Sequence, residues 1–113
     1  VDEFHPEKNY NWGYDPMQYL SLEGSYSLNP DDPYSRMKEM RELVSTFHKK
    51  GMRVNLDVVF NHTYDVDSCC FNCVVPYYYY RYNEGGFLSN GSFCGNDFAS
   101  DKPMARKYLL YVI

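Results

Sequence analysis

Apolar residues recur at helical spacing between residues 34 and 50, with charged residues on the other faces. Five apolar positions form the stripe: Met37, Met40, Leu43, Val44 and Phe47. Asp32 before Pro33 suits a helix N-cap followed by a proline in the first turn, and Gly51 can end the helix in a left-handed conformation. The pattern predicts an amphipathic helix over residues 34–50.

A nearly continuous apolar run follows over residues 52–62, as is typical of a strand that is buried on both faces of a parallel sheet. Asp57, Asn61 and His62 are out of place in such a strand, because polar side chains are rarely buried without a reason. Function in α/β folds gathers at the carboxyl ends of strands. We therefore expect a helix and strand of an α/β unit, with a candidate site where the strand ends.

The remaining segments read as long loops and a second helix. Residues 1–33 and 63–99 are rich in glycine, proline, asparagine and aspartate, and loops of such length usually line or cover a site. Residues 101–113 return to helical spacing, with Ser100 or Asp101 as the expected cap and Pro103 in the first turn. The expected inward stripe of this helix has four members: Met104, Tyr108, Tyr111 and Val112.

Composition narrows the possible functions. The chain has 113 residues, a net charge of −4 and no basic cluster longer than Lys49-Lys50, so we expect no nucleic-acid partner. No apolar stretch approaches the length of a membrane span, so no membrane partner is expected either. The 13 tyrosines suit either packing or contact with sugar rings. The start at Val1 and the apolar end indicate part of a larger protein, and the compartment stays open.

Four cysteines allow several interpretations. Cys70 and Cys73 have the spacing of a zinc hook that Cys94 or His62 could complete, but a structural zinc site normally shows a second close pair. A disulfide framework is less favoured, because the adjacent Cys69 and Cys70 suit reduced thiols. Free cysteines in a loop are the leading interpretation, and a zinc-binding interaction domain stays as an alternative.

Several separated motifs resemble one enzyme family. Residues 57–62, Asp-Val-Val-Phe-Asn-His, resemble the first signature region of the α-amylase family of glycoside hydrolases, at the end of the third barrel strand. Residues 10–16, Tyr-Asn-Trp-Gly-Tyr-Asp-Pro, resemble the segment after the second strand in the pullulanase and debranching branch. Further matches, in the same order along the chain, are residues 23–27, 47–48, 94–96 and 99–100. Departures from the pattern are Cys69, Cys70, Cys73, and Tyr77 in place of an expected glycine.

The resemblance implies a fold and a set of sugar contacts. Residues 1–113 would be part of a (β/α)8 TIM barrel, an α/β catalytic domain, running from the loop after strand 2 through helix 2, strand 3 and a long loop to the start of helix 3. Tyr14 would stack under a sugar ring, Asp57 would support the site, His62 would donate to a sugar hydroxyl, and Asn96 would line the cleft. Trp12 and Asn61 would be structural. No cofactor is implied, although the position of Asn61 contacts calcium in some amylases.

From the residues alone, purely structural roles are as consistent with the sequence as these sugar contacts. Tyr14 could pack in its loop, His62 could satisfy loop carbonyl groups, and Asp57 could be a structural hydrogen-bond hub. We expect these three side chains to converge on one concave face if they share a site.

The implied activity is hydrolysis of α-1,6 bonds in starch, glycogen or pullulan with retention of configuration. That chemistry needs two carboxyl groups about 5 Å apart. In the family they come from the fourth and fifth strands, so none of the 113 residues is expected to be catalytic and the chain alone should be inactive. The alternatives are another α-glucan-active enzyme, such as an amylase or branching enzyme, and a carbohydrate-binding module that uses the tyrosines of residues 77–82.

Overall fold

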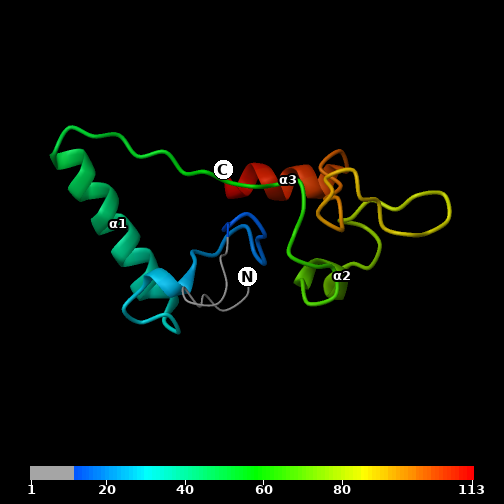
Figure 1. Cartoon of the computed structure of the whole chain (residues 1–113), viewed down its shortest axis with the longest axis horizontal. Helices are drawn as coiled ribbons and strands as arrows, with labels where there is room; N and C mark the ends of the chain where they lie inside the picture. The colour runs from blue at the N-terminus through cyan, green and yellow to red at the C-terminus, as the bar shows by residue number, and fades with distance from the viewer. Residues whose placement is uncertain (1–11) are drawn as a thin grey trace.

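The structure is a computed structural model that describes residues 12–113. The predicted loop over residues 1–11, with Tyr10 and Asn11 of the tryptophan motif, lies outside the described residues. The described chain contains a 3-10 turn η1 (Gly24–Tyr26) and the helices α1 (Pro33–Lys49), α2 (Cys70–Val74) and α3 (Pro103–Val112). Figure 1 shows α1 standing apart from a compact half that holds α2 and α3, in a molecule of 53 × 35 × 24 Å.

Helix α1 confirms the first predicted element and its signals. The Asp32 carboxylate accepts hydrogen bonds from the backbone N–H groups of Tyr34 and Ser35, each at 3.1 Å, and from the Ser35 hydroxyl at 2.6 Å. Pro33 occupies the first turn, where its missing N–H costs nothing. Gly51 follows with φ of +75°, the left-handed conformation that glycine adopts without strain.

Residues 52–60 are extended but pair with no neighbouring strand among the described residues. Figure 1 shows this segment as a long connection between α1 and the compact half. Leu56 and Val58, which the apolar pattern placed inside a sheet, are 65% and 56% exposed. The expectation of burial fails for these side chains in this chain, because burial of a strand needs neighbouring strands and layers on both of its faces.

Aromatic packing builds the core of the compact half. Phe71 lies at the centre, with its ring centroid 5.1 Å from Phe98, 5.0 Å from Tyr79 and 5.1 Å from Tyr108. Tyr80 is fully buried beside them. Such edge-to-face and tilted pairs add stability beyond the burial of area. Part of the tyrosine excess in the composition is therefore explained by packing.

The loop over residues 63–99 contains more structure than expected. It holds the short helix α2 and two isolated antiparallel bridges, Tyr80 with Phe98 and Tyr82 with Leu88. Tyr77 has φ of +62°, so the left-handed conformation exists at the position where we expected glycine. All four cysteines are free thiols, as the leading interpretation held.

Helix α3 confirms the last predicted helix but corrects its cap and its inward face. Its N-cap is Lys102, without a side-chain capping bond, and neither Ser100 nor Asp101 occupies that position. Met104 and Tyr111 are 51% and 76% exposed, whereas Ala105 is fully buried. The stripe that meets the core consists of Ala105, Tyr108 and Leu109. These residues share i, i+3, i+4 spacing, so the predicted register was wrong by one position at its start.

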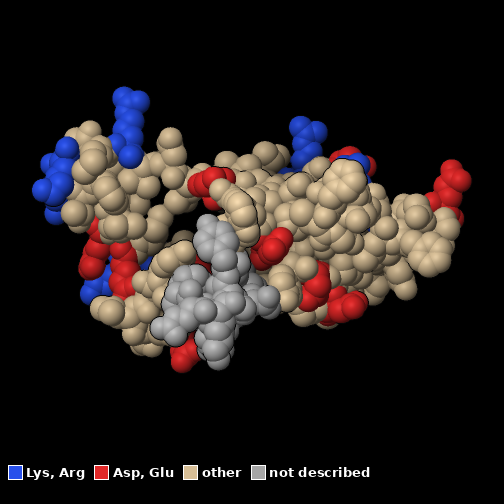
Figure 2. Space-filling model, in the orientation of Figure 1, with Lys and Arg blue, Asp and Glu red and all other residues tan. Residues whose placement is uncertain are grey.

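Two surface properties bear on partners. No helix in the described part of the chain is both long and apolar enough to cross a membrane. Figure 2 shows that most Lys and Arg side chains on the visible face lie over α1, whereas Asp and Glu are spread along the molecule. On this face the basic side chains of the described residues are therefore concentrated over one helix, and the absence of a nucleic-acid partner stays a prediction.

Candidate functional site

Two segments that are distant in the sequence meet at the end of the extended run. The Tyr14 hydroxyl donates to Asp57 Oδ2 at 3.2 Å, and Asp15 Oδ1 lies 2.9 Å from His62 Nε2. One step further on, the Tyr64 N–H donates to the Pro16 carbonyl at 2.9 Å. The segment with Tyr14 therefore runs beside the segment with Asp57 and His62, and we call Tyr14, Asp15, Asp57 and His62 the rim. Convergence of Tyr14, Asp57 and His62 on one concave face stays a prediction.

His62 is held from several sides. Its ring is nearly buried, with 4% of the residue exposed, and Nδ1 lies 2.9 Å from Asn61 Oδ1. The Tyr19 hydroxyl donates to the His62 carbonyl at 2.8 Å. Burial raises the pKa of Tyr19 far above its ordinary value of 10, so this hydroxyl keeps the proton that it donates. The imidazole is therefore fixed in one orientation, which a recognition group requires.

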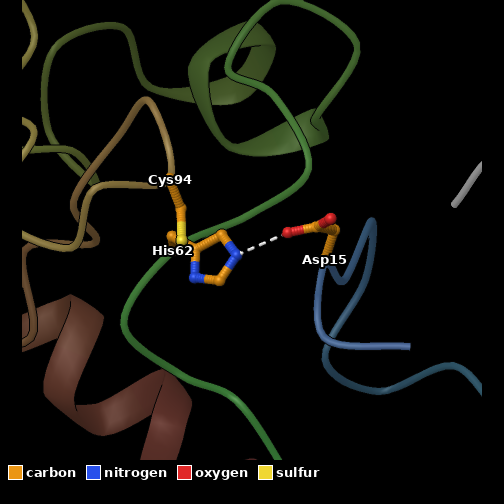
Figure 3. A group of neighbouring side chains, drawn as sticks. All are labelled: Asp15, His62 and Cys94. Atoms are coloured by element: carbon orange, nitrogen blue, oxygen red, sulfur yellow. Dashed lines mark hydrogen bonds and ion pairs between the residues drawn. The ribbon is translucent and has the colours of Figure 1, made fainter. Parts of the chain in front are cut away.

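Asp15 is a site residue that the sequence analysis missed. It was included only in the motif over residues 10–16 and in the loop over residues 1–33, without a role of its own. In the structure its carboxylate is 58% exposed and pairs with His62 (Figure 3). The available signal was its place directly after Tyr14, since a residue beside a rim aromatic can reach the same rim.

Asn96 supports the site from beneath. Its Nδ2 donates to the Thr63 carbonyl at 2.8 Å, and its Oδ1 accepts from the Thr63 N–H at 3.0 Å. Asn96 is 2% exposed and Thr63 is fully buried. The Thr63 hydroxyl also lies 2.8 Å from the buried Tyr80 hydroxyl and donates to the Asp65 carbonyl at 2.7 Å. The Asn96 amide therefore fixes the residue that follows His62, and contact of Asn96 with sugar stays a prediction.

Asp97 organises the loop that carries Cys94. Its carboxylate accepts hydrogen bonds from the Ser89 hydroxyl at 2.6 Å and from the N–H groups of Gly91 and Ser92, each at 2.7 Å. Partial burial works to raise the pKa of Asp97, but these hydrogen bonds stabilise the charged form more strongly and hold its pKa well below the usual range. The loop is thereby folded around a fixed charge.

The remaining predicted residues lie at the surface. Tyr14 is 46% exposed, so its ring remains accessible to a ligand while its hydroxyl is held by Asp57. Trp12 is 75% exposed, and its structural role stays a prediction. Both ring nitrogens of His62 already face protein oxygens, so donation to a sugar requires a hydroxyl to replace Asp15.

The site contains one group of side chains that could bind a metal ion. Within residues 12–113, one group of three potential ligands is close enough to share an ion: Asp15, His62 and Cys94, with ligand atoms within 4.8 Å of one another. Calcium prefers six to eight oxygen ligands, which an imidazole and a thiol do not provide, and Asn61 Oδ1 is engaged by His62. This group of three therefore does not fit calcium. Cys70 and Cys73 belong to no such group in the described part of the chain.

Comparison with protein families gives one match that covers most of the chain. Residues 4–75 match the family model described as alpha amylase, catalytic domain. This range includes the tryptophan motif and the run that ends at His62, so the family match falls on both segments of the rim.

Curated relatives extend the similarity. The chain is 48% identical over 109 residues to a pullulanase of Bacillus subtilis strain 168, which covers 96% of this chain and 15% of that protein. It is 36% identical over 114 residues to pullulanase 1, chloroplastic, of Arabidopsis thaliana, which covers 96% of this chain and 12% of that protein. The chain thus spans a small part of the length of these relatives.

Solved structures agree with the sequence matches. A pullulanase from Anoxybacillus sp. LM18-11, crystallised in complex with maltotetraose, superposes with a TM-score of 0.90 at 46% identity and covers 99% of this chain and 16% of that one. A pullulanase from Paenibacillus barengoltzii, in complex with maltohexaose and alpha-cyclodextrin, has a TM-score of 0.88 at 47% identity and covers 91% and 16%. The described arrangement is therefore similar to a part of these larger proteins.

Proposed function

We propose that this chain, which belongs to the alpha-amylase catalytic-domain family, forms part of a pullulanase-type α-glucan hydrolase. The proposed enzyme cleaves α-1,6 bonds. Identities of 36% to 48% to pullulanases along nearly the whole chain support this branch over an amylase or a branching enzyme. An α-glucan chain is the proposed partner. Maltotetraose in the Anoxybacillus structure supports a ligand of this class.

The fold follows from the same proposal. Residues 52–62 form the third strand of a (β/α)8 barrel, α1 is the helix before it, and the segment with Tyr14 is the loop after the second strand. The exposed Leu56 and Val58 support this placement, because they share one face of the extended segment and an apolar face is suited to burial against another layer. Residues 1–113 then belong to one catalytic domain.

One observation carries the assignment of the site: the Tyr14 hydroxyl donates to Asp57 while Tyr14 as a whole is 46% exposed. A flat aromatic face packs on the apolar face of a pyranose, and a held hydroxyl keeps the ring in one orientation. His62 pairs with Asp15, the residue that follows Tyr14. The rim therefore suits an uncharged polyol.

The residues of this chain bind and orient the sugar rather than break the bond. Tyr14 positions the ring, Asp57 holds Tyr14, and His62 donates one hydrogen bond to a sugar hydroxyl after Asp15 releases its nitrogen. Cleavage with retention needs a nucleophile and an acid that are about 5 to 5.5 Å apart. We place both carboxyl groups on other strands of the barrel, because Asp57 and Asp15 are engaged in holding Tyr14 and His62.

Hydrolysis of pullulan and of linear amylose by the protein that carries this chain tests the proposal. We expect release of reducing ends from pullulan and little from amylose. Replacement Tyr14→Ala removes the stacking face and should lower kcat/KM on pullulan by roughly tenfold, since each 1.4 kcal/mol of lost binding is a factor of ten. Tyr14→Phe keeps the face and should stay within about threefold of the parent rate.

The control is Tyr26→Ala. Tyr26 lies in η1 beside α1 and is 90% exposed, so its removal should leave kcat/KM unchanged. Equal losses in Tyr14→Ala and Tyr26→Ala would contradict the sugar platform. Preference for amylose over pullulan would contradict the pullulanase assignment.

A further inference from the structure

Cys94 approaches the rim from a third segment of the chain. The ligand atoms of Asp15, His62 and Cys94 lie within 4.8 Å of one another, and Figure 3 shows Asp15 and Cys94 approaching the imidazole from different segments. Asp15 and Cys94 are exposed, so ions from solvent can reach the group, whereas His62 is buried. The sugar-binding role described above does not use the thiol.

The hydrogen bonds of His62 point independently to a cation. Nδ1 faces Asn61 Oδ1 and Nε2 faces a carboxylate oxygen, and both of these partners are acceptors. A neutral imidazole has a single N–H and can satisfy one of the two contacts, so both are satisfied only when a positive charge, either a second proton or a metal ion, is present. With the proton on Nδ1, the lone pair of Nε2 is directed at Asp15, and a positive charge between them satisfies both groups. Asn61 would then be the outer partner that typically orients a metal-bound histidine.

We propose that Asp15, His62 and Cys94 bind a borderline-soft divalent cation of the Zn²⁺ class, with the fourth position open to water. Imidazole, carboxylate and thiolate are the usual ligands of such ions, and three protein ligands with an open position is a common arrangement. Binding forms a metal–sulfur bond at Cys94 and releases the thiol proton to solvent, with no change of oxidation state.

The geometry requires only a small adjustment. Tetrahedral bonds of about 2.0 to 2.3 Å place ligand atoms roughly 3.3 to 3.8 Å apart. Cys94 therefore moves inward by about 1 Å, and the 2.9 Å contact between Asp15 and His62 opens slightly. Cys94 lies in an exposed loop and is followed by Gly95 with φ of +88°, so the backbone there tolerates such a shift.

The proposed ion would compete with the sugar. It occupies Nε2 of His62, the nitrogen that the proposed function gives to a sugar hydroxyl. The site is therefore inhibitory, and this consequence alone rests on the proposed function.

Isothermal titration of the protein that carries this chain, after removal of metal with a chelator, measures Zn²⁺ binding directly. Cys94→Ser should weaken the Zn²⁺ site by roughly tenfold to a hundredfold. Because Cys94 is exposed, the variant should keep its fold, which a thermal melt checks. Cys73→Ser is the matched control, since it removes another exposed thiol from the zinc-hook pair. It should leave binding unchanged, and Ca²⁺ should not bind this group.

Cd²⁺ gives a second readout that needs no activity. The parent chain and Cys73→Ser should both show thiolate-to-metal absorption in the ultraviolet, and Cys94→Ser should show less of it. If pullulan is cleaved, Zn²⁺ should also inhibit the parent more strongly than Cys94→Ser, each relative to its own rate with chelator.

Equal Zn²⁺ affinity in Cys94→Ser and the parent would overturn the proposal, and loss of binding in Cys73→Ser instead would assign the ion to the zinc hook. In either case a rotated Asn61 amide would satisfy His62 without an ion. Binding that is lost in Cys94→Ser supports the metal site even if pullulan is not hydrolysed, so failure of the proposed function is distinguishable from failure of this proposal.

Discussion

Removal of the Asn96 side chain is the sharpest test of how the rim is built. Asn96 donates to the Thr63 carbonyl and accepts from the Thr63 N–H, in a place where Asn96 is 2% exposed and Thr63 is fully buried. Within residues 12–113 the Asn96 amide is the partner of both this N–H and this carbonyl. Asn96→Ala therefore leaves a buried donor and a buried acceptor without partners.

The expected cost follows from these groups. A buried polar group that loses its partner costs about 1 to 3 kcal/mol, so the pair gives roughly 2 to 6 kcal/mol. Asn96→Asp keeps the acceptor but points a second oxygen at the Thr63 carbonyl, and it should cost at least as much. The matched control is Asn90→Ala on the same loop. The Asn90 side chain is exposed and accepts one hydrogen bond, from the Gly95 N–H at 2.7 Å, so its removal should cost at most about 1 kcal/mol.

Two measurements follow the change in the protein that carries this chain. Urea unfolding reports the loss of free energy, and hydrogen exchange reports it locally at the Thr63 amide, which donates directly to Asn96. A cost of 2 kcal/mol corresponds to exchange at least about 30-fold faster at that amide. Because Thr63 follows His62, we also expect a lower kcat on pullulan in Asn96→Ala.

One result would refute this reasoning. If Asn96→Ala and Asn90→Ala lost the same free energy, and the Thr63 amide stayed equally protected in both variants, Asn96 would not hold Thr63. The position of His62 would then have to depend on other contacts.

Two further predictions concern charged groups. The pKa of Asp97 is lowered in the folded protein, so the stability that Asp97 contributes is complete above its unfolded pKa of 3.8 and is lost as the pH falls below that value. The free energy of unfolding, measured between about pH 5 and pH 2, should therefore fall less steeply in Asp97→Asn than in the parent or in the control Asp31→Asn. Parallel curves would contradict the role of the hydrogen bonds from Ser89, Gly91 and Ser92. Asp32→Ala removes the N-cap of α1 and should lower the free energy of unfolding in urea by about 0.5 to 2 kcal/mol. Asp31→Ala should lower it by less than about 0.5 kcal/mol, because the N–H groups of Tyr34 and Ser35 donate to Asp32. Equal losses would show that the cap contributes nothing.

Local signals in the sequence predicted α1 well, because each of them acts within a few residues. Asp32, Pro33 and Gly51 occupy the positions that their chemistry favours, and the structure shows all three in those positions. The predicted inward face of α3 was confirmed at Tyr108 but wrong at Met104 and Tyr111. The choice between Met104 and Ala105 depends on which residues the core offers, and this information lies elsewhere in the chain. Burial of Leu56 and Val58 likewise depends on strands that this structure does not pair with them.

The site shows the same division. The polar residues at the end of the apolar run were visible as an anomaly of pattern, and the resemblance added Tyr14 to them. The structure then joins Tyr14 to Asp57. Asp15 and Cys94 were not assigned to the rim, because their contact with His62 spans 47 residues of sequence in one case and a long loop in the other. No periodicity encodes such a contact.

The contacts of His62 indicate how the rim residues can be held in place although residues 52–60 pair with no described strand. In the usual account of an α/β site, the strand carries the functional side chain and the sheet holds the strand. Here residues 52–60 pair with no strand in the described chain. His62 is held instead by hydrogen bonds: its carbonyl accepts from Tyr19, and its ring contacts Asp15 and Asn61. Asn96 holds the next residue, Thr63. Loss of one of these loop hydrogen bonds should therefore weaken sugar binding more than a conservative change at an exposed apolar position such as Leu56.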